Sequence, residues 1–193
     1  MIRPLHEQFE AEKVQEIREI QSSFNSLPFE GRAAKYFIDE IISCLDAGLL
    51  LAALEVATTF LELFVRDLLV IARCGSNVTS RPLFLDKVRR ELEDEERLSF
   101  GGMVDELEGL EVIDPSDAHE IKDFYKTVRV PVHHGLTRRL ICGPSYIPED
   151  FYDWLFSGPK DRLHEVEKLV EDDSIRHLSD IANFIVKYCK GSD

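Results

Sequence analysis

The chain has 193 residues, of which 44% are hydrophobic and 31% are charged, and its formal net charge is −14. This length suits a single domain over residues 1–193, and the composition is that of an ordinary globular protein rather than a disordered or fibrous one. So acidic a chain lacks the broad basic surface that holds nucleic acid by neutralising phosphates, so any contact with nucleic acid has to be local.

Neither a secretory signal nor a membrane segment is apparent. The first residues lack a long apolar run, and the most apolar stretch, Gly48 to Ala72, is interrupted by four charged residues. The four cysteines are far apart and match no spacing typical of zinc ligands. We therefore expect a cytoplasmic protein with free thiols, without a metal or a cofactor, and without membrane contact.

Helical periodicity runs through the N-terminal part of the chain. We expect one helix over Leu5 to Phe24, ended by the segment Ser26 to Gly31, which contains Pro28. A second helix should cover Arg32 to Asp46 and close at Gly48, because glycine commonly ends helices.

The clearest element follows Gly48. Apolar residues there recur in alternating steps of three and four, the spacing of one helix face. They are Leu51, Leu54, Thr58, Leu61, Val65, Leu68 and Ala72, with a second stripe of Ala53, Ala57, Phe60 and Phe64. A helix that is apolar over so wide an arc packs against several neighbours, so it should be the central helix of a bundle.

The second half of the chain also predicts helices. They are expected over Leu83 to Arg97, Met103 to Leu110, Ala118 to about Val128, Lys160 to Val170 and Ser174 to Lys190. Ser99–Gly102 is expected to be a turn or cap before one of these helices. Asp114–Asp117 is expected to start another, because proline is tolerated in a first turn and short polar side chains cap free N–H groups. No segment alternates like a strand. The expected class is therefore all-α, an antiparallel helical bundle with additional N- and C-terminal helices.

One stretch runs against the acidic balance. Between positions 122 and 139 there are five basic residues and one acidic residue. The basic residues are Lys122, Lys126, Arg129, Arg138 and Arg139, and the acidic one is Asp123. A positive island in an acidic protein can concentrate an anion at one site, although a solvated helix face would have the same composition.

Within this island, Arg129 is followed after four residues by His134 and then by Gly135, in the sequence VRVPVHHGL. This motif resembles the signature of the HEPN superfamily, in which an Arg precedes a His by four to six residues. Two stretches upstream are similar to the same family, namely the alanine- and leucine-rich segment 52–69 and the turn at Ser99–Met103. The resemblance spans about Arg32 to Leu140.

The resemblance implies a helical bundle that often dimerises and, in active members, a metal-independent endoribonuclease of the kind found in toxin–antitoxin and phage-defence systems. His134 would then be the general acid and base acting on the ribose 2′-hydroxyl or the leaving oxygen, and Arg129 would stabilise the charged phosphate. Imidazole titrates near neutral pH and guanidinium offers a charged planar fork, so the residue types suit these roles.

Other residues are candidates for supporting roles. Lys126, Arg138 and Arg139 would contact the RNA substrate in a local basic cleft. Glu62 and Arg66 could reach the same cleft from the central helix, or could form an ion pair with each other, because they are four residues apart.

On a straight helix the side chains of Arg129 and His134 would point about 140° apart. Pro131 removes a backbone donor and disfavours helical geometry at Val130, so we predict a kink or helix end between them. The same motif from a second subunit would complete the site, which implies a homodimer.

The chain departs from the family pattern at Val130, because active members usually carry a polar residue directly after the Arg. His133 could replace that polar group or lie on the surface. Two hypotheses therefore stay open: an endoribonuclease, and a non-catalytic HEPN-like module that binds a partner protein, such as an antitoxin, or a nucleotide. In the second, Arg129 pairs with an acidic neighbour and His134 caps the helix end. A third hypothesis is a helical adaptor whose acidic faces bind a basic partner.

Overall fold

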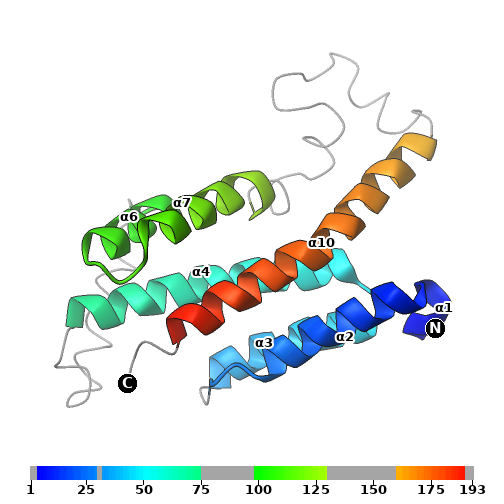
Figure 1. Cartoon of the computed structure of the whole chain (residues 1–193), viewed down its shortest axis with the longest axis horizontal. Coiled ribbons are helices and arrows are strands. Elements are labelled where there is room, and N and C mark those ends of the chain that lie inside the picture. The colour runs from blue at the N-terminus through cyan, green and yellow to red at the C-terminus, as the bar shows by residue number, and fades with distance from the viewer. Residues whose placement is uncertain (1–3, 30–31, 75–97, 130–159, 190–193) are drawn as a thin grey trace.

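The fold is seen in a computed structural model that describes residues 4–29, 32–74, 98–129 and 160–189 (Figure 1). Side chains in these ranges are described except those of Arg32 and residues 160–172. Each regular element in this part of the chain is a helix, so the predicted all-α class is confirmed. The elements are α1 (Leu5–Gln8), α2 (Ala11–Asn25), α3 (Arg32–Asp46), α4 (Leu50–Cys74), α6 (Phe100–Gly109), α7 (Pro115–Phe124), η2 (Tyr125–Arg129) and α10 (Lys160–Cys189).

The helices form three layers around α4. In Figure 1, α4 and α10 lie between the α2–α3 pair on one side and the α6–α7 pair on the other. Helix α4 packs against α3, α6 and α10, and α10 also packs against α2. The prediction that α4 is the central helix is therefore confirmed.

Burial along α4 explains this central position. Both predicted stripes contribute fully buried side chains, among them Leu54, Leu61 and Val65 from one and Ala57 and Phe60 from the other. The first stripe is less buried at its two ends, because Leu51 is 39% exposed and Ala72 is only partly buried. Burying large side chains on several faces of one helix contributes about 1.5–3 kcal/mol each, so α4 anchors the whole core.

The N-terminal segment differs from the prediction. Instead of one helix over Leu5 to Phe24, the chain forms α1 and α2, separated by extended backbone at Phe9 and Glu10. The side chain of Phe9 packs against the core, and the side-chain amide of Gln8 donates to the carbonyl of Ala47 at 3.3 Å. The break therefore lets α1 fold back onto the turn between α3 and α4.

That turn confirms the predicted helix end at Gly48. Gly48 has a φ of 72°, in the left-handed region that favours glycine. Its amide donates to the carbonyl of Leu45, and the amide of Leu49 donates to that of Cys44. The tight turn reverses the chain, so α3 and α4 are antiparallel neighbours.

Two helices in the second half begin three residues earlier than predicted. Helix α6 starts at Phe100 rather than Met103, with the Ser99 hydroxyl accepting from the amide of Gly102 at 3.2 Å. Helix α7 starts at Pro115 rather than Ala118, because proline fits the first helical turn. Both segments therefore mark helix starts, but only Ser99 makes a side-chain cap, whereas Asp114 before α7 makes none.

The C-terminal region forms one helix rather than two. Helix α10 runs without interruption from Lys160 to Cys189, through the point where a break was predicted near residues 171–173. No glycine or proline stands there, and Ser174 is fully buried inside the helix instead of capping a new one. Its side chains Leu178, Ile181 and Ile185 lie in the core.

Two predictions of local structure, the helix Leu83–Arg97 and the bend at Pro131, fall on residues that the structure does not describe. No helix in the described ranges combines the length and the apolarity needed to span a membrane.

Candidate functional site

The residue that begins the HEPN-like motif lies at the end of an irregular helical turn. Helix α7 changes from α to π winding at Tyr125, and the π turn ends at Arg129. Short π turns are rare and occur frequently at functional sites, because they alter which way the following side chains point. Val128 is buried in this turn, so the backbone before Arg129 is anchored to the core.

The guanidinium of Arg129 is directed at the central helix. Its Nη2 donates to Oε2 of Glu62 at 2.8 Å, joining residues that are 67 positions apart in the chain. The side chains of Arg129 and Glu62 are only 18% and 26% exposed. A charge-assisted hydrogen bond in such a setting holds the guanidinium in one orientation.

The ring of Tyr125 makes a second contact with the same guanidinium. Its central carbon lies 5.1 Å from the centroid of the Tyr125 ring, within the range of a cation–π interaction. Tyr125 is in turn stacked on Phe100 of α6, with ring centroids 4.1 Å apart and planes 4° from parallel. Arg129 is thus held by side chains from α4 and by a ring fixed against α6.

The charges around Tyr125 also affect its ionisation. Burial raises the pKa of the Tyr125 hydroxyl, and the negative charge of Glu62 raises it further, against the opposing effect of Arg129. The hydroxyl therefore stays protonated at neutral pH, and Tyr125 supports the site as a neutral ring.

Of the predicted supporting residues, Glu62 is brought to Arg129 and the others are placed differently. Arg66 is half-buried one turn further along α4, and it has no ion pair or hydrogen bond within the described ranges. The alternative of a Glu62–Arg66 pair is therefore replaced by the pair with Arg129. Lys126 is exposed on the π turn, where it faces solvent.

Four predicted site residues lie outside the described residues: His133, His134, Arg138 and Arg139. The predicted convergence of Arg129 and His134 is therefore still a prediction. Lys122, in the same basic island, is turned away to α6, where its ammonium donates to Asp105 at 2.6 Å and to Glu108 at 3.5 Å.

An ion pair also joins the end of α4 to α6. Arg73 at the end of α4 binds Glu106 of α6 through two hydrogen bonds of 2.7 Å, a fork-to-fork arrangement. The hydrogen bond from Arg73 lowers the pKa of the Glu106 carboxyl, although burial opposes it. The Arg73–Glu106 pair thus ties the C-terminal end of α4 to α6.

Sequence reasoning missed Tyr125. It precedes Arg129 by four residues, the spacing that places two side chains on one face of a helix, so the cation–π contact had a recognisable signal. The free thiols that were expected are seen at Cys44, Cys74 and Cys189. Among the described residues, no group of three or more His, Cys, Asp or Glu side chains is arranged to hold a metal ion.

Comparison with known proteins identified no relative of the chain. A scan against protein-family models found no match, and searches of curated proteins and of solved structures found no significant match.

Proposed function

We propose that the chain is a HEPN-like, metal-independent endoribonuclease in which Arg129 binds the phosphate and His134 moves the protons. The observation that carries the proposal is the built environment of Arg129, held by Glu62 at 2.8 Å and by the Tyr125 ring at 5.1 Å. A guanidinium fixed before substrate arrives stabilises transition-state charge without having to be reoriented. Arg129 also begins the motif that resembles the family signature.

The proposed reaction needs no metal. The ribose 2′-oxygen attacks the adjacent phosphorus while its proton passes to a neutral imidazole, and the 5′-oxygen of the next nucleotide leaves with a proton. The products are a 2′,3′-cyclic phosphate and a free 5′-hydroxyl. Arg129 would stabilise the negative phosphate oxygens, and the homodimer would bring a second copy of the motif to the cleft.

A second candidate function is a non-catalytic module that binds a partner protein or a nucleotide. The Glu62–Arg129 ion pair specifically favours it, because a carboxylate at 2.8 Å offsets the charge that would attract a phosphate. In this case the pair stabilises the bundle instead of binding a phosphate.

Cleavage of single-stranded RNA in EDTA separates the two functions. We expect the wild-type chain to cleave, and Arg129→Ala and His134→Ala each to reduce the rate by at least about 100-fold. Products ending in a 2′,3′-cyclic phosphate would identify the attacking group.

The matched control is Arg73→Ala, which also removes a half-buried, ion-paired arginine, but one that binds Glu106 away from the motif. It should cleave at nearly the wild-type rate. Equal rates in all four proteins would mean a contaminating nuclease. Absence of cleavage in the wild type, with a folded circular-dichroism spectrum, would favour the binding module.

A further inference from the structure

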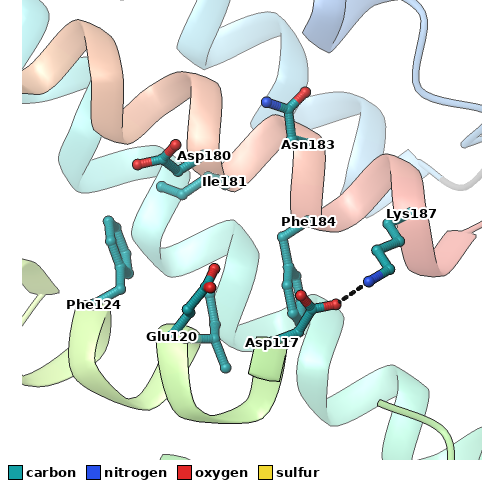
Figure 2. A pocket seen from close by; sticks show the side chains of 9 residues that line it. Asp117, Glu120, Phe124, Asp180, Ile181, Asn183, Phe184 and Lys187 are labelled. Atoms are coloured by element: carbon teal, nitrogen blue, oxygen red, sulfur yellow. Dashed lines mark hydrogen bonds and ion pairs between the residues drawn. The ribbon is translucent and has the colours of Figure 1, made fainter. Parts of the chain in front are cut away.

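Helices α7 and α10 touch at two ends and leave a groove between them. At one end, Lys187 and Tyr188 of α10 both donate hydrogen bonds to the carboxylate of Asp117 on α7. At the other end, the ring of Phe124 lies edge-on to His177, with centroids 5.5 Å apart. The groove that remains between these contacts has a volume of about 320 Å³ (Figure 2).

The groove combines an apolar floor with a polar rim. The floor is formed by Ile121, Phe124, Ile181 and Phe184, and the rim by Asp117, Glu120, Asp180, Asn183 and Lys187. Ile121 and Ile181 are almost completely buried, whereas Glu120 and Asp180 are exposed. A volume of this order is at the lower end for ligand sites, so the groove suits one or two side chains better than a large molecule.

The two ends of the groove differ in charge. Lys187 is neutralised by Asp114 at 2.8 Å and Asp117 at 2.5 Å, so that end carries no uncompensated cation. Glu120 and Asp180, in contrast, have no hydrogen bond or ion pair within the described part of the chain. Figure 2 shows Glu120 and Phe124 rising from α7 toward α10, with Asp180 across the groove. Two carboxylates without a partner among the described residues therefore lie at the rim of the groove that the Phe124 ring also lines.

We propose that this groove docks a basic segment of a partner protein, with a Lys or Arg side chain entering between Glu120 and Asp180. The aliphatic stem of such a side chain would lie on Ile121 and Phe124, and its cationic head would meet the carboxylates and the ring. The formal net charge of −14 attracts a basic partner over a longer range and repels a polyanion such as RNA.

The groove is lined by residues other than those that hold Arg129. It lies between α7 and α10, whereas the Arg129 guanidinium is directed at Glu62 on α4. The two proposals are tested with different variants and different ligands, so they can fail independently.

The test uses the full chain and a short fluorescein-labelled peptide of alternating Leu and Lys, measured by fluorescence anisotropy at near-physiological salt. We expect the wild-type chain to bind, and Glu120→Gln/Asp180→Asn to weaken binding by at least about tenfold, because close charge pairs dominate such contacts. The matched control is Glu12→Gln/Glu16→Gln on α2, which removes the same charge from another exposed helix face. It should change the affinity by less than about twofold, since distant charges are screened.

Two further measurements test whether the ring contributes to binding and whether RNA binds in the groove instead. Phe124→Leu keeps an apolar side chain but removes the ring, and it should weaken binding of the peptide severalfold. Its thermal unfolding midpoint, compared with that of the wild type, shows whether the variant is folded. Equal weakening in the groove and control variants would overturn the proposal, as would a wild-type chain that does not bind the peptide. Weaker binding of labelled polyuridylate in the groove variant alone would assign the groove to RNA instead, and would equally overturn the proposal.

Discussion

Arg129 owes its orientation to contacts from three helices. Glu62 supplies a charged acceptor from α4, Tyr125 supplies a ring from the π turn, and Phe100 of α6 stacks on that ring. Together these groups hold the guanidinium in one position. An arginine held in this way can bind a phosphate or can stabilise the bundle. The second role predicts a measurable contribution of the ion pair to the free energy of unfolding.

The stability contributed by the pair can be measured with a double-mutant cycle. Glu62→Gln and Arg129→Gln should each lower the free energy of unfolding by about 1–2 kcal/mol, because each leaves a charged partner partly buried without its counter-charge. The double variant should lose less than the sum, since it leaves no unpaired charge. Urea unfolding followed by circular dichroism gives all four values.

Strict additivity within about 0.3 kcal/mol would contradict a direct interaction between the two side chains. Lys35→Gln on α3 serves as the reference for removing a cation from an exposed surface, and it should change stability by less than about 0.5 kcal/mol. The cycle subtracts the other contacts of Arg129, so it isolates the pair.

His177 predicts a different response, to pH. Burial lowers the pKa of its imidazole, helped by the charge of Arg176 and opposed by Asp173 and Asp180. Its Nδ1 is buried with no hydrogen-bond partner in the described ranges. Because the unfolded chain then binds a proton more readily than the folded one, stability is complete above the ordinary histidine pKa of about 6.5. It is lost as the pH falls from there toward the lower folded value.

We therefore expect urea unfolding at a series of pH values from neutral down to about 5 to show a decline that His177→Gln reduces. One proton limits the contribution to about 1.4 kcal/mol per pH unit. The matched control is His119→Gln on α7, which is exposed and should leave the slope unchanged. An identical slope in the wild type and the His177 variant would contradict the neutral, buried imidazole.

At the scale of elements, the turn between α3 and α4 sets the position of α1. A Cβ on Gly48 would lie 2.7 Å from Oε1 of Gln8 and 3.0 Å from the Phe9 ring, and its φ of 72° is unfavourable for other residues. Gly48→Ala should therefore lower the free energy of unfolding by about 1–2 kcal/mol in urea titration.

The contrasting variant is Gly109→Ala. Nothing lies within 4 Å of a Cβ at Gly109, which is the last residue of α6. Alanine there should raise stability by about 0.4–1 kcal/mol, because it reduces the freedom of the unfolded chain. A Gly48→Ala protein as stable as the wild type would show that α1 does not depend on the turn.

The same elements show what local sequence can and cannot predict. The bounds of α3 were correct because Pro28 and Gly48 punctuate both ends, and α4 was correct because its apolar stripes are long and regular. The break at Phe9 has no glycine or proline to mark it, since it arises from packing onto a turn that is distant in sequence. Near residues 171–173 a boundary between two helices was predicted, but α10 continues through it with Ser174 fully buried.

The candidate site divides in the same way. Arg129 could be chosen from its motif, and Glu62 could be suspected because it lies on the central helix. That the two side chains pair with each other depends on the π turn that orients Arg129. The five residues of this turn have an ordinary composition, so the sequence does not predict it. Tyr125 could have been identified from its position four residues before Arg129, whereas the groove between α7 and α10 depends on the relative placement of helices, which periodicity within one helix does not contain.

At the scale of the whole molecule, the acidic balance limits how RNA could bind. The net charge of −14 excludes a large basic footprint, so the proposed nuclease would use few phosphate contacts. The candidates for those contacts are Lys126, Arg129, Arg138 and Arg139. For single-stranded nucleic acid, the logarithm of the binding constant falls with the logarithm of salt concentration with a slope of about −0.7 per contact, so four contacts predict a slope of about −3.

Lys126 offers the clearest test of this limit, because it is exposed on the π turn. Lys126→Gln should reduce the magnitude of the slope by about 0.7 when labelled RNA is titrated by anisotropy at several salt concentrations. Lys35→Gln, an exposed lysine on α3 away from the motif, should leave the slope unchanged. If both variants reduce it equally, RNA is held diffusely and the local-cleft proposal is wrong. If the wild-type slope is near zero, phosphate contacts are absent, and the binding module becomes the better account of why Arg129 is paired with Glu62.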